Sequence, residues 1–355
     1  MKINKMINLI LPCAGKSSRF PGKPKWLLTC PNGNLMIQES LSCLDLTDVN
    51  NIFITFVKEH IDKYFPRGNI YDLFKKYKNL KITILENFTQ SQTETVYLTI
   101  KKNNIQGAIF IKDCDSYYNY KIKKGNYACS LIVNEKNNVS TLYNKSFIEK
   151  NALNQIINFC EKKIISNIIC VGGYSFENSK LFIDFYEKCK DIQLNTKEFH
   201  ISHLIHFCLL ENEIFYSEEI ENFIEWGTPS EWKNYKDSFS TLFLDIDGTI
   251  FKNSGQYSVP SWGYSEPLKE NLEVIKNLYN KGRTQIILTT ARKKEFEEIT
   301  KTQLKKYNVP YDDIIFGLLH SKRILINDYS DTNPYPSSIS INIKRDSNEL
   351  KNLLF

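Results

Sequence analysis

Short apolar runs alternate with helical patterns along the first two thirds of the chain. The runs are rich in Ile, Val, Leu and Phe and are bounded by polar or turn-forming residues. This alternation predicts an α/β domain in which a mostly parallel, Rossmann-like sheet carries helices on both faces. The strands are expected at 7–12, 51–57, 81–87, 107–113 and 168–174.

A second, shorter cycle of the same kind begins at Thr241, after the polar and aromatic stretch 226–240. It also predicts a mostly parallel sheet with helices on both faces, and so a second Rossmann-like domain. We therefore place one α/β domain at 1–238 and a second α/β domain at 239–355. In the second domain, strands are expected at 241–247, 284–291 and 323–328, and helices at 268–282 and 294–308.

The composition fits this picture, because 42% hydrophobic and 24% charged residues are typical of a soluble globular protein. No apolar stretch is long enough to span a bilayer, and the N-terminal apolar run leads directly into charged residues. We expect no membrane insertion and a cytoplasmic location. The nine cysteines include no CxxC pair, which favours reduced thiols.

The net charge of +6 is spread along the chain and includes no basic block. This distribution argues against a nucleic-acid partner and is compatible with a small anionic ligand. A homo-oligomer remains open at this stage.

The loop after the first strand combines small residues with positive charge. Backbone there can approach a phosphate, and Arg19 and Lys25 supply charge. The GKS at 15–17 lacks the earlier glycine of a Walker A loop, and a solvated surface turn is the alternative interpretation. The nucleotide-binding candidates in this loop are Ala14, Gly15, Lys16, Ser17 and Ser18.

Carboxylates follow other strands of the first domain. Asp113 and Asp115 end the strand at 107–113, and Glu225 precedes a Gly-Thr-Pro turn. Oxygen ligands of this kind suit Mg²⁺, the one cofactor that the sequence suggests. A phosphate-binding loop opposite carboxylates is what a nucleoside triphosphate and its metal need.

Taken in order, these segments resemble the sugar-phosphate nucleotidyltransferases (nucleotide-sugar pyrophosphorylases), over about residues 7–236. "LPCAGKSSRFPGKPKWLL" is similar to the opening signature of that family, except that Ser17 replaces its second glycine. Glu225 stands where the family has an aspartate. The other matching segments are "NFTQSQTETV" (87–96), "KDCDSYY" (112–118), "FIEK" (147–150), "VGGYSFEN" (171–178) and "EWGTPSEW" (225–232).

The resemblance implies that a nucleoside triphosphate and a phosphorylated sugar or polyol are the partners. Arg19 and Lys25 would contact the triphosphate, and Gln90 and Thr95 would lie near the base or ribose. Lys150 would meet the acceptor phosphate. Asp115 and Glu225 would hold Mg²⁺ with Asp113 as helper, and the substrate-side residues would include Gly173, Tyr174 and Ser202.

"FLDIDGT" (243–249) resembles the first motif of the haloacid dehalogenase-like (HAD-like) phosphatases, over about residues 241–346. The resemblance implies an aspartyl-phosphate on Asp245 and a general acid at Asp247. Thr290 would bind phosphoryl oxygens. Asp245, Asp247 and Asp328 would hold Mg²⁺.

The second resemblance departs from its family in two places. No lysine stands cleanly at the third motif, so Lys322 or Arg323 must replace it. Only 13 residues separate Thr249 from Gly263, so no large cap domain is expected.

Three histidines at helical spacing, His200, His203 and His206, could suggest a metal site. Leucine and isoleucine lie between them, so we favour a helix packed against the core.

The sequence thus predicts a bifunctional enzyme. The first domain would transfer a nucleotidyl group, from CTP in preference, to a sugar or polyol phosphate for surface polysaccharide precursors such as capsule. The second would be a Mg²⁺-dependent phosphatase. The alternatives are a catalytically silent HAD-like domain used for binding, regulation or dimerisation, and a nucleotide-sensing protein without turnover.

Overall fold

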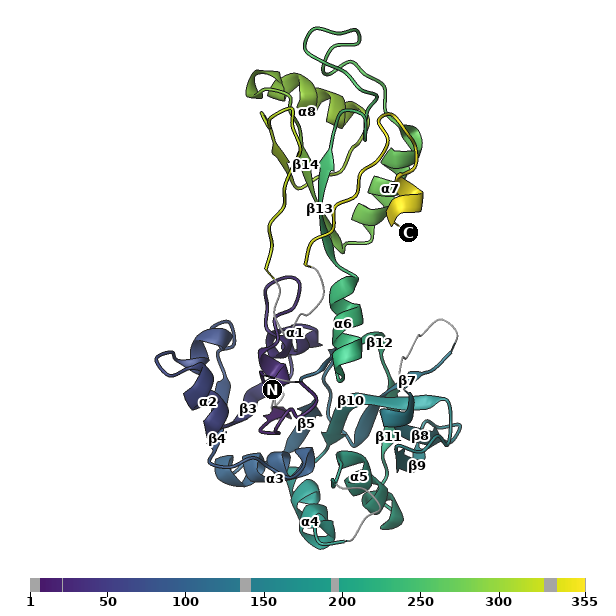
Figure 1. Cartoon of the computed structure of the whole chain (residues 1–355). Coiled ribbons are helices and arrows are strands. Elements are labelled where there is room, and N and C mark those ends of the chain that lie inside the picture. The colour runs from purple at the N-terminus through teal and green to yellow at the C-terminus, as the bar shows by residue number, and fades with distance from the viewer. Residues whose placement is uncertain (1–6, 21, 135–141, 193–197, 329–336, 355) are drawn as a thin grey trace, which may run out of the picture. The chain divides into compact units, whose positions relative to one another are not determined.

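The computed structural model describes residues 7–20, 22–134, 142–192, 198–328 and 337–354. The chain divides into two compact units, unit 1 (Met1–Tyr235) and unit 2 (Lys236–Phe355). Figure 1 shows both, and helix α6 (Pro229–Asp237) runs across the division. Each unit is described by itself.

Unit 1 begins with strand β1 (Ile7–Cys13) and contains most of the described strands. The other strands are β2 (Leu44–Asp45), β3 (Val49–Val57), β4 (Leu80–Leu85), β5 (Ala108–Lys112), β6 (Ser116–Lys121), β7 (Tyr127–Ile132), β8 (Ser146–Lys150), β9 (Ile156–Glu161), β10 (Ile168–Phe176), β11 (Tyr216–Glu219) and β12 (Glu221–Glu225). The α-helices are α1 (Met36–Ser42), α2 (Lys58–Tyr64), α3 (Gln92–Asn103), α4 (Ser179–Cys189) and α5 (Ile201–Leu210), and the 3-10 helices are η1 (Lys25–Leu27), η2 (Ile70–Phe74) and η3 (Leu142–Asn144).

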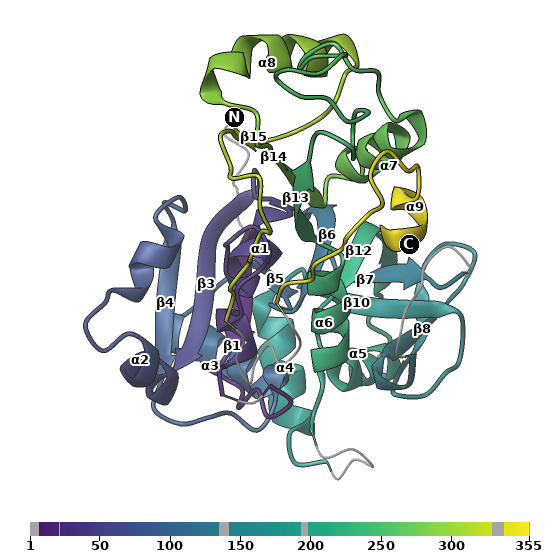
Figure 2. The same ribbon diagram turned by 45° about the horizontal axis from the view of Figure 1, so that its top comes forward.

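The main sheet of unit 1 is mixed rather than mostly parallel as expected. Its path is β11-β7-β10-β5-β1-β3-β4, with β8 and β9 attached through β10. Strands β4, β3, β1 and β5 are parallel, and Figure 2 shows β4, β3 and β1 side by side. Strand β10 then pairs antiparallel with both β5 and β7. The apolar pattern located these strands but not their directions, because a strand that is buried on both faces looks the same in either orientation.

Both faces of this sheet are covered, which explains the continuous apolar runs. In β1, Leu9 and Leu11 pack into the core with α1 and η2, whereas Ile10 packs on the opposite face with α3, α4 and α5. Successive side chains of a strand point to opposite faces, so a strand between two helical layers is apolar at every position. The expected strands at 7–12, 51–57, 81–87, 107–113 and 168–174 are confirmed in β1, β3, β4, β5 and β10.

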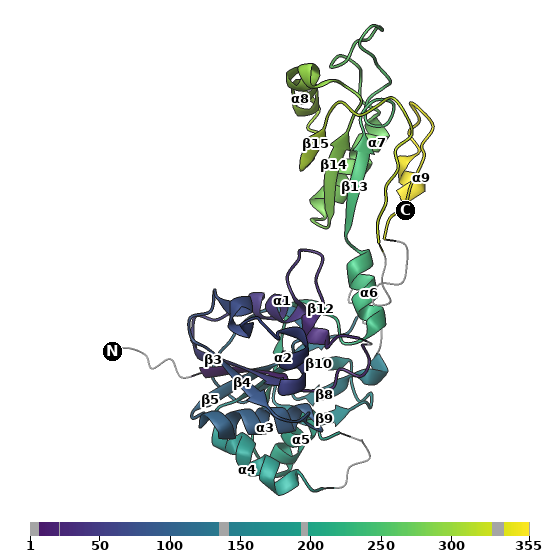
Figure 3. The same cartoon turned by 60° about the vertical axis from the view of Figure 1, so that its left-hand side comes forward.

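Unit 2 contains a smaller sheet of three described strands. Strands β13 (Ser240–Asp245), β14 (Thr284–Thr289) and β15 (Asp313–Ile315) are parallel and lie side by side in that order (Figure 3). The helices are α7 (Lys269–Asn280), η4 (Lys294–Phe296), α8 (Glu297–Lys306) and α9 (Leu350–Leu354). The predicted strands at 241–247 and 284–291 and both predicted helices are therefore present.

The strand expected at 323–328 does not form. These residues have no regular secondary structure and pair with no strand among the described residues, and Ile324 and Ile326 are 72% and 88% exposed. An apolar run becomes a strand only when a neighbouring strand edge pairs with it and a layer of side chains covers it, and the described part of the chain provides neither for this run.

No helix among the described residues has the length and apolar character that crossing a membrane requires.

Candidate functional site

The loop after β1 starts at the carboxyl end of a parallel strand and is largely exposed from Gly15 to Arg19. Ser17 has a φ of +53°, a left-handed conformation that favours glycine, which accounts for the glycine that similar loops carry there. The Ser17 carbonyl accepts a hydrogen bond from Phe20 N (2.9 Å), and its hydroxyl accepts one from Lys25 N (3.2 Å). The loop is thus folded back so that Lys25 starts η1 beside it.

Lys25 makes an ion pair with Asp115, with 2.5 Å between Nζ and Oδ2. The two side chains are 31% and 16% exposed, so the pair is partly shielded from water. Burial alone would lower the pKa of Lys25, but the Asp115 carboxylate outweighs burial and raises it. Burial alone would raise the pKa of Asp115, and Lys25 in turn holds that pKa below its usual value. A charged pair therefore stands at the ends of β1 and β5.

Strand pairing brings Glu225 next to Asp115. Strand β12 pairs antiparallel with β6 so that Glu225 lies opposite Ser116, and Trp226 N donates to the Asp115 carbonyl (2.8 Å). Trp226 is fully buried and fixes this strand end. A Cβ built on Gly227 would lie 3.4 Å from both Asp115 Oδ2 and Glu225 Oε1, so the two carboxylates face the same space.

Arg19 reaches the same place, since its Nη1 donates to the Gly227 carbonyl (3.4 Å). The structure therefore brings together Arg19, Lys25, Asp115 and Glu225, which come from three separate segments of the chain.

Lys145 is a member of this cluster that the sequence did not reveal. It is 8% exposed and forms an ion pair with Glu225. Burial lowers its pKa, against the attraction of the neighbouring carboxylates. Lys145 carries no motif of its own, and only its contacts with Glu225 and the Phe223 ring of β12 place it there.

A second polar group surrounds Glu161, which is buried at the end of β9. Its Oε2 accepts hydrogen bonds from the Ser146 and Ser202 hydroxyls, the latter at 2.7 Å. His200 Nε2 lies 3.7 Å from Glu161 Oε1, and Lys162 Nζ lies 3.8 Å from the same oxygen. Burial would raise the pKa of Glu161, but His200 and the two hydroxyls outweigh it and hold that pKa below its usual value.

This Glu161 group is joined to the first cluster through the backbone, because Lys162 N donates to the Lys145 carbonyl (2.9 Å). The sequence analysis named Ser202 and placed the Glu-Lys pair at 149–150. The pair Glu161-Lys162, twelve residues further on, has the same two residue types and is the pair that lies in this group.

Lys150, the expected acceptor-phosphate residue, is not brought to either cluster. It ends β8, whereas Lys145 precedes the start of that strand, and five strand residues separate two positions by about 16 Å. Its Nζ donates to Asn154 Oδ1 at 2.9 Å.

The structure also places the residues expected near the nucleotide base and the substrate. Gln90 is exposed on the loop before α3. Thr95 is 1% exposed. Its hydroxyl forms a hydrogen bond with the Thr89 hydroxyl (2.6 Å) and donates another to the Ser91 carbonyl (3.2 Å), so Thr95 holds that loop from its buried side. Tyr174 is also buried, and Gly173 packs against the Tyr118 hydroxyl, so both expected substrate contacts are core positions of β10.

His203 and His206 lie on α5 and His200 is its N-cap residue, and the helix packs on the core as expected. No group of three or more His, Cys, Asp or Glu side chains in the described ranges is placed to hold a metal ion. His203 Nδ1 accepts a hydrogen bond from His200 N (3.1 Å), and burial lowers the pKa of His203 to about 4.

Asp113 is held by α3 and β10. Gln92 Nε2 donates to its carboxylate, and burial, together with Asp115, raises the pKa of Asp113 to about 6. Gly172 lies directly against this carboxylate with a φ of +80°.

We expect Gly172→Ala to destabilise unit 1 by about 1–3 kcal/mol, the usual cost of a strained backbone conformation. The added Cβ would overlap the Asp113 carboxylate and the backbone would remain left-handed. Denaturant unfolding followed by tryptophan fluorescence measures the change. Gly15→Ala is the matched control, because a Cβ there meets nothing within 4 Å. Equal midpoints for the two variants would contradict the packing described.

Asp115 and Glu225 suit Mg²⁺ in charge and ligand type, and Gly227 leaves space between them. Mg²⁺ is commonly held in proteins by one or two carboxylates together with substrate phosphates. The pair therefore fits such an ion only when phosphate oxygens complete its ligands, since no larger carboxylate group is described here.

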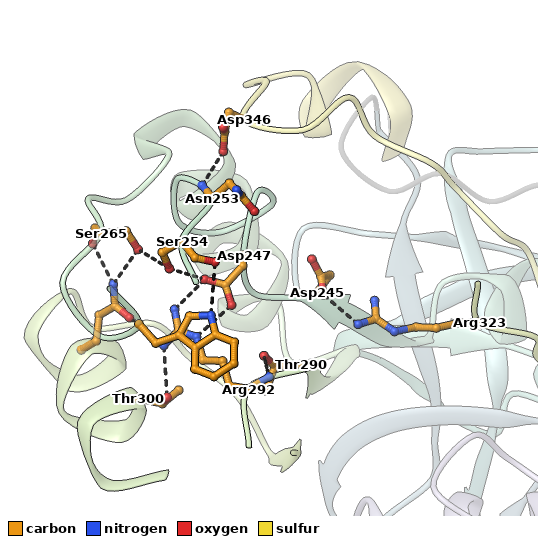
Figure 4. Close-up of polar contacts among 12 residues, drawn as sticks. Asp245, Asp247, Asn253, Ser254, Ser265, Thr290, Arg292, Thr300, Arg323 and Asp346 are labelled. Atoms are coloured by element: carbon orange, nitrogen blue, oxygen red, sulfur yellow. Dashed lines mark hydrogen bonds and ion pairs between the residues drawn. The ribbon is translucent and has the colours of Figure 1, made fainter. Parts of the chain in front are cut away.

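In unit 2, Asp247 follows β13 and is held by a fully buried arginine (Figure 4). Arg292 Nε and Nη2 each donate to one Asp247 oxygen at 2.8 Å, and Ser254 Oγ donates to Oδ1 at 2.7 Å. The remaining guanidinium nitrogen donates to Thr300 (3.1 Å) and Gln303 (2.9 Å). Arg292 directly follows Thr290 and Ala291 in the segment "TTAR" (289–292), and no motif marked it as a functional residue.

Asp245 ends β13 and lies near Arg323, with Nη2 3.0 Å from Oδ1. Burial raises the pKa of Asp245, and Arg323 opposes that rise. Of the two residues expected to supply the positive charge, Arg323 makes this contact and Lys322 is exposed. Thr290 is buried at the end of β14, where its hydroxyl accepts from Arg292 N (3.0 Å).

Asp328 does not complete the expected metal set with Asp245 and Asp247. It is exposed in the stretch that forms no strand, and these three carboxylates make no metal-binding group within the described part of unit 2. Both oxygens of Asp247 are also taken by Arg292. The arrangement described for unit 2 therefore does not fit a magnesium ion.

Comparison with solved structures shows what the main fold is similar to. A nucleoside-diphosphate-sugar pyrophosphorylase from Vibrio cholerae RC9 matches with a TM-score of 0.56 at 19% identity, over 64% of this chain and 99% of its own. A Bacillus anthracis protein described as a glucose-1-phosphate thymidylyltransferase matches with a TM-score of 0.51 at 15% identity, over 65% and 94%. The inositol-1-phosphate CTP transferase from T. maritima gives a TM-score of 0.48 at 13% identity, over 65% and 93%.

At these identities the likeness shows the fold alone, a mixed α/β fold with a large sheet and helices. No protein-family model matches the sequence. No curated protein matches it either.

Proposed function

We propose that unit 1 transfers a nucleotidyl group from a nucleoside triphosphate to the phosphate of a sugar or polyol and releases pyrophosphate. One observation carries the proposal. Arg19, Lys25 and Lys145 converge on Asp115 and Glu225 near the carboxyl ends of β1 and β5. Ligands of parallel α/β sheets bind at such strand ends, and the fold likeness is to nucleotidyltransferase-type structures.

The three cations bind and orient the triphosphate, whose negative charge matches theirs. An oxygen of the acceptor phosphate attacks the α-phosphorus, and the bond from that phosphorus to the bridging β-phosphate oxygen breaks. Pyrophosphate leaves with the electron pair. Positioning and charge neutralisation account for the rate, and no covalent enzyme intermediate is needed.

Asp115 and Glu225 would hold Mg²⁺. Asp113, which accepts a hydrogen bond from Gln92, would assist them. When bound, the ion neutralises charge on the phosphate oxygens. The chain's own part is to keep two carboxylates and two lysines in one partly shielded space.

We assign the binding of the acceptor, the sugar or polyol phosphate, to the Glu161 group. A buried carboxylate beside Ser202 and His200 can accept hydrogen bonds from sugar or polyol hydroxyls, and Lys162 can meet the acceptor phosphate. The activated sugar or polyol is the class of donor that transferases of surface polysaccharide synthesis consume.

The experiment incubates the purified protein with each common triphosphate, CTP first, with Mg²⁺ and a panel of sugar and polyol phosphates. Pyrophosphate release is measured. Turnover with one pair supports the proposal. Binding of a triphosphate without release for any pair favours the nucleotide-sensing alternative.

We propose a second function for unit 2, hydrolysis of a phosphate monoester. The supporting observation is that Asp245 and Arg323 lie together at the end of the parallel strand β13, and that Thr290 directly follows the end of the neighbouring strand β14. A carboxylate oxygen of Asp245 attacks phosphorus, the ester oxygen leaves, and water then cleaves the aspartyl-phosphate. Asp247 is the general-acid candidate, and donating a proton from it requires breaking a bond to Arg292.

We expect Asp245→Asn to abolish phosphate release from phosphate monoesters, because an amide is not a nucleophile of this kind. Inorganic phosphate is assayed, and the exposed Asp313→Asn in the same unit serves as control. If wild type and Asp245→Asn release phosphate equally, unit 2 is catalytically silent and serves binding, regulation or dimerisation.

A further inference from the structure

Lys112 is a fully buried lysine at the end of β5, and the reaction proposed above gives it no role. Its ammonium group has three hydrogens and makes three hydrogen bonds. Nζ donates to the Asp113 carbonyl (2.8 Å), to the Ser116 carbonyl (2.7 Å) and to the Ser116 hydroxyl (2.7 Å). All three acceptors belong to the turn 113–116, and none of them is a carboxylate.

Burying an ammonium group in a protein core is unfavourable in free energy. Removing such a group from water costs several kcal/mol, and an apolar side chain of similar volume is often equally stable or more so. Nζ also lies 4.4 Å from the ring centroid of Tyr118, which contributes a cation–π contact. The environment thus accommodates the charge, but packing alone does not explain why a charge is present.

The bonds of Lys112 close the turn that carries Asp113 and Asp115. One bond holds the carbonyl at the start of the turn, and two hold the residue at its end. Two backbone hydrogen bonds also hold the turn: Asp113 N donates to the Gly172 carbonyl (2.8 Å), and Trp226 N donates to the Asp115 carbonyl (2.8 Å). Lys112 adds the side-chain hydrogen bonds that join the two ends of the turn.

We propose that Lys112 is a positioning residue that fixes the Asp113–Ser116 turn so that Asp115 meets the metal–triphosphate complex beside Glu225. The inference rests on the nucleotidyl transfer proposed for unit 1. Lys112 acts through the turn and does not touch the substrate. Groups that hold a metal ligand in place commonly change metal affinity or activity about 10- to 100-fold when they are lost.

Lys112→Met tests the proposal, because methionine keeps the length of the side chain and removes the ammonium. We expect the half-saturating Mg²⁺ concentration for pyrophosphate release to rise about 10- to 100-fold, with the KM for the acceptor unchanged. Binding of Mn²⁺ in the presence of the triphosphate and without acceptor, measured by electron paramagnetic resonance, should weaken by a similar factor. A merely structural role would not weaken metal binding selectively.

Two further variants keep the test decisive. Ser116→Ala removes one acceptor and keeps the lysine, and should weaken Mn²⁺ binding less than Lys112→Met; it decides the matter if Lys112→Met does not fold. Lys121→Met, at the exposed end of the next strand, is the matched control and should bind Mn²⁺ as wild type.

Wild-type Mn²⁺ binding in a folded Lys112→Met or Ser116→Ala variant overturns the proposal. If wild type binds Mn²⁺ with nucleotide but no substrate pair gives pyrophosphate, nucleotidyl transfer fails while the Mn²⁺ result on Lys112 still stands.

Discussion

Lys25→Met should lower the rate of pyrophosphate release about 10²- to 10³-fold, the usual loss when one preorganised donor at a developing charge is removed. Lys25 is the cation nearest to Asp115, and the Asp115 carboxylate raises its pKa, so it stays charged through the neutral range. Methionine keeps most of the side-chain volume and removes only the charge. Steady-state kinetics with the active substrate pair measure the loss.

Lys58→Met provides the control for this variant. Lys58 also makes an ion pair, with Glu86 at 3.0 Å, but the pair is exposed on α2 and the loop after β4. Exposed pairs of this kind contribute little, so neither rate nor stability should change measurably. A Lys25→Met enzyme that is as fast as Lys58→Met would remove Lys25 from the proposed phosphate site.

Arg292→Met should destabilise unit 2 by about 3–5 kcal/mol, the cost of leaving a buried charge without its partner. Arg292 is fully buried, and the Asp247 side chain is 15% exposed, so water cannot replace the two lost hydrogen bonds fully. Thr300 and Gln303 lose a donor at the same time. Because the chain has two units, hydrogen exchange at the amides of β14 and α7 is the appropriate measurement.

The double variant Arg292→Met with Asp247→Leu separates charge from packing. It should recover much of the lost stability, because no charge is then left unpaired. Arg283→Met removes an exposed arginine from the same unit and should have an effect within about 0.5 kcal/mol. Equal protection of β14 in Arg292→Met and Arg283→Met would contradict the buried ion pair.

Local pattern predicted most of the individual elements. Runs such as 51–57 and 107–113 became β3 and β5 because they are apolar on both faces, and the helical spacing at 268–282 became α7. The run 323–328 shows the limit of this reasoning. Its residues are as apolar as those of β13, but no strand of the described residues pairs with them, and they do not form a strand.

The position of a residue in the candidate site could be predicted where its motif gave it a role. It could not be predicted where only tertiary contacts place the residue there. Arg19, Lys25, Asp115 and Glu225 follow strands or turns, and the structure brings them together as the sequence suggested. Lys145 lies outside the matching segments, Lys112 opens the segment "KDCDSYY" but received no role there, and Lys150 lies at the other end of β8 from Lys145. The sequence alone does not show which end of a strand will lie at the cluster.

The sequence by itself determined the alternation of strands and helices, the acidic and basic loops at strand ends, and the residue types needed to bind phosphate. These features depend on neighbours within a few positions, where apolar spacing and turn chemistry act directly. Only the tertiary structure decided the antiparallel insertion of β10, the pairing of Lys145 with Glu225 and the burial of Arg292 on Asp247. Those depend on contacts between residues far apart in the chain, whose energies are set by burial and partner geometry and leave no local signature.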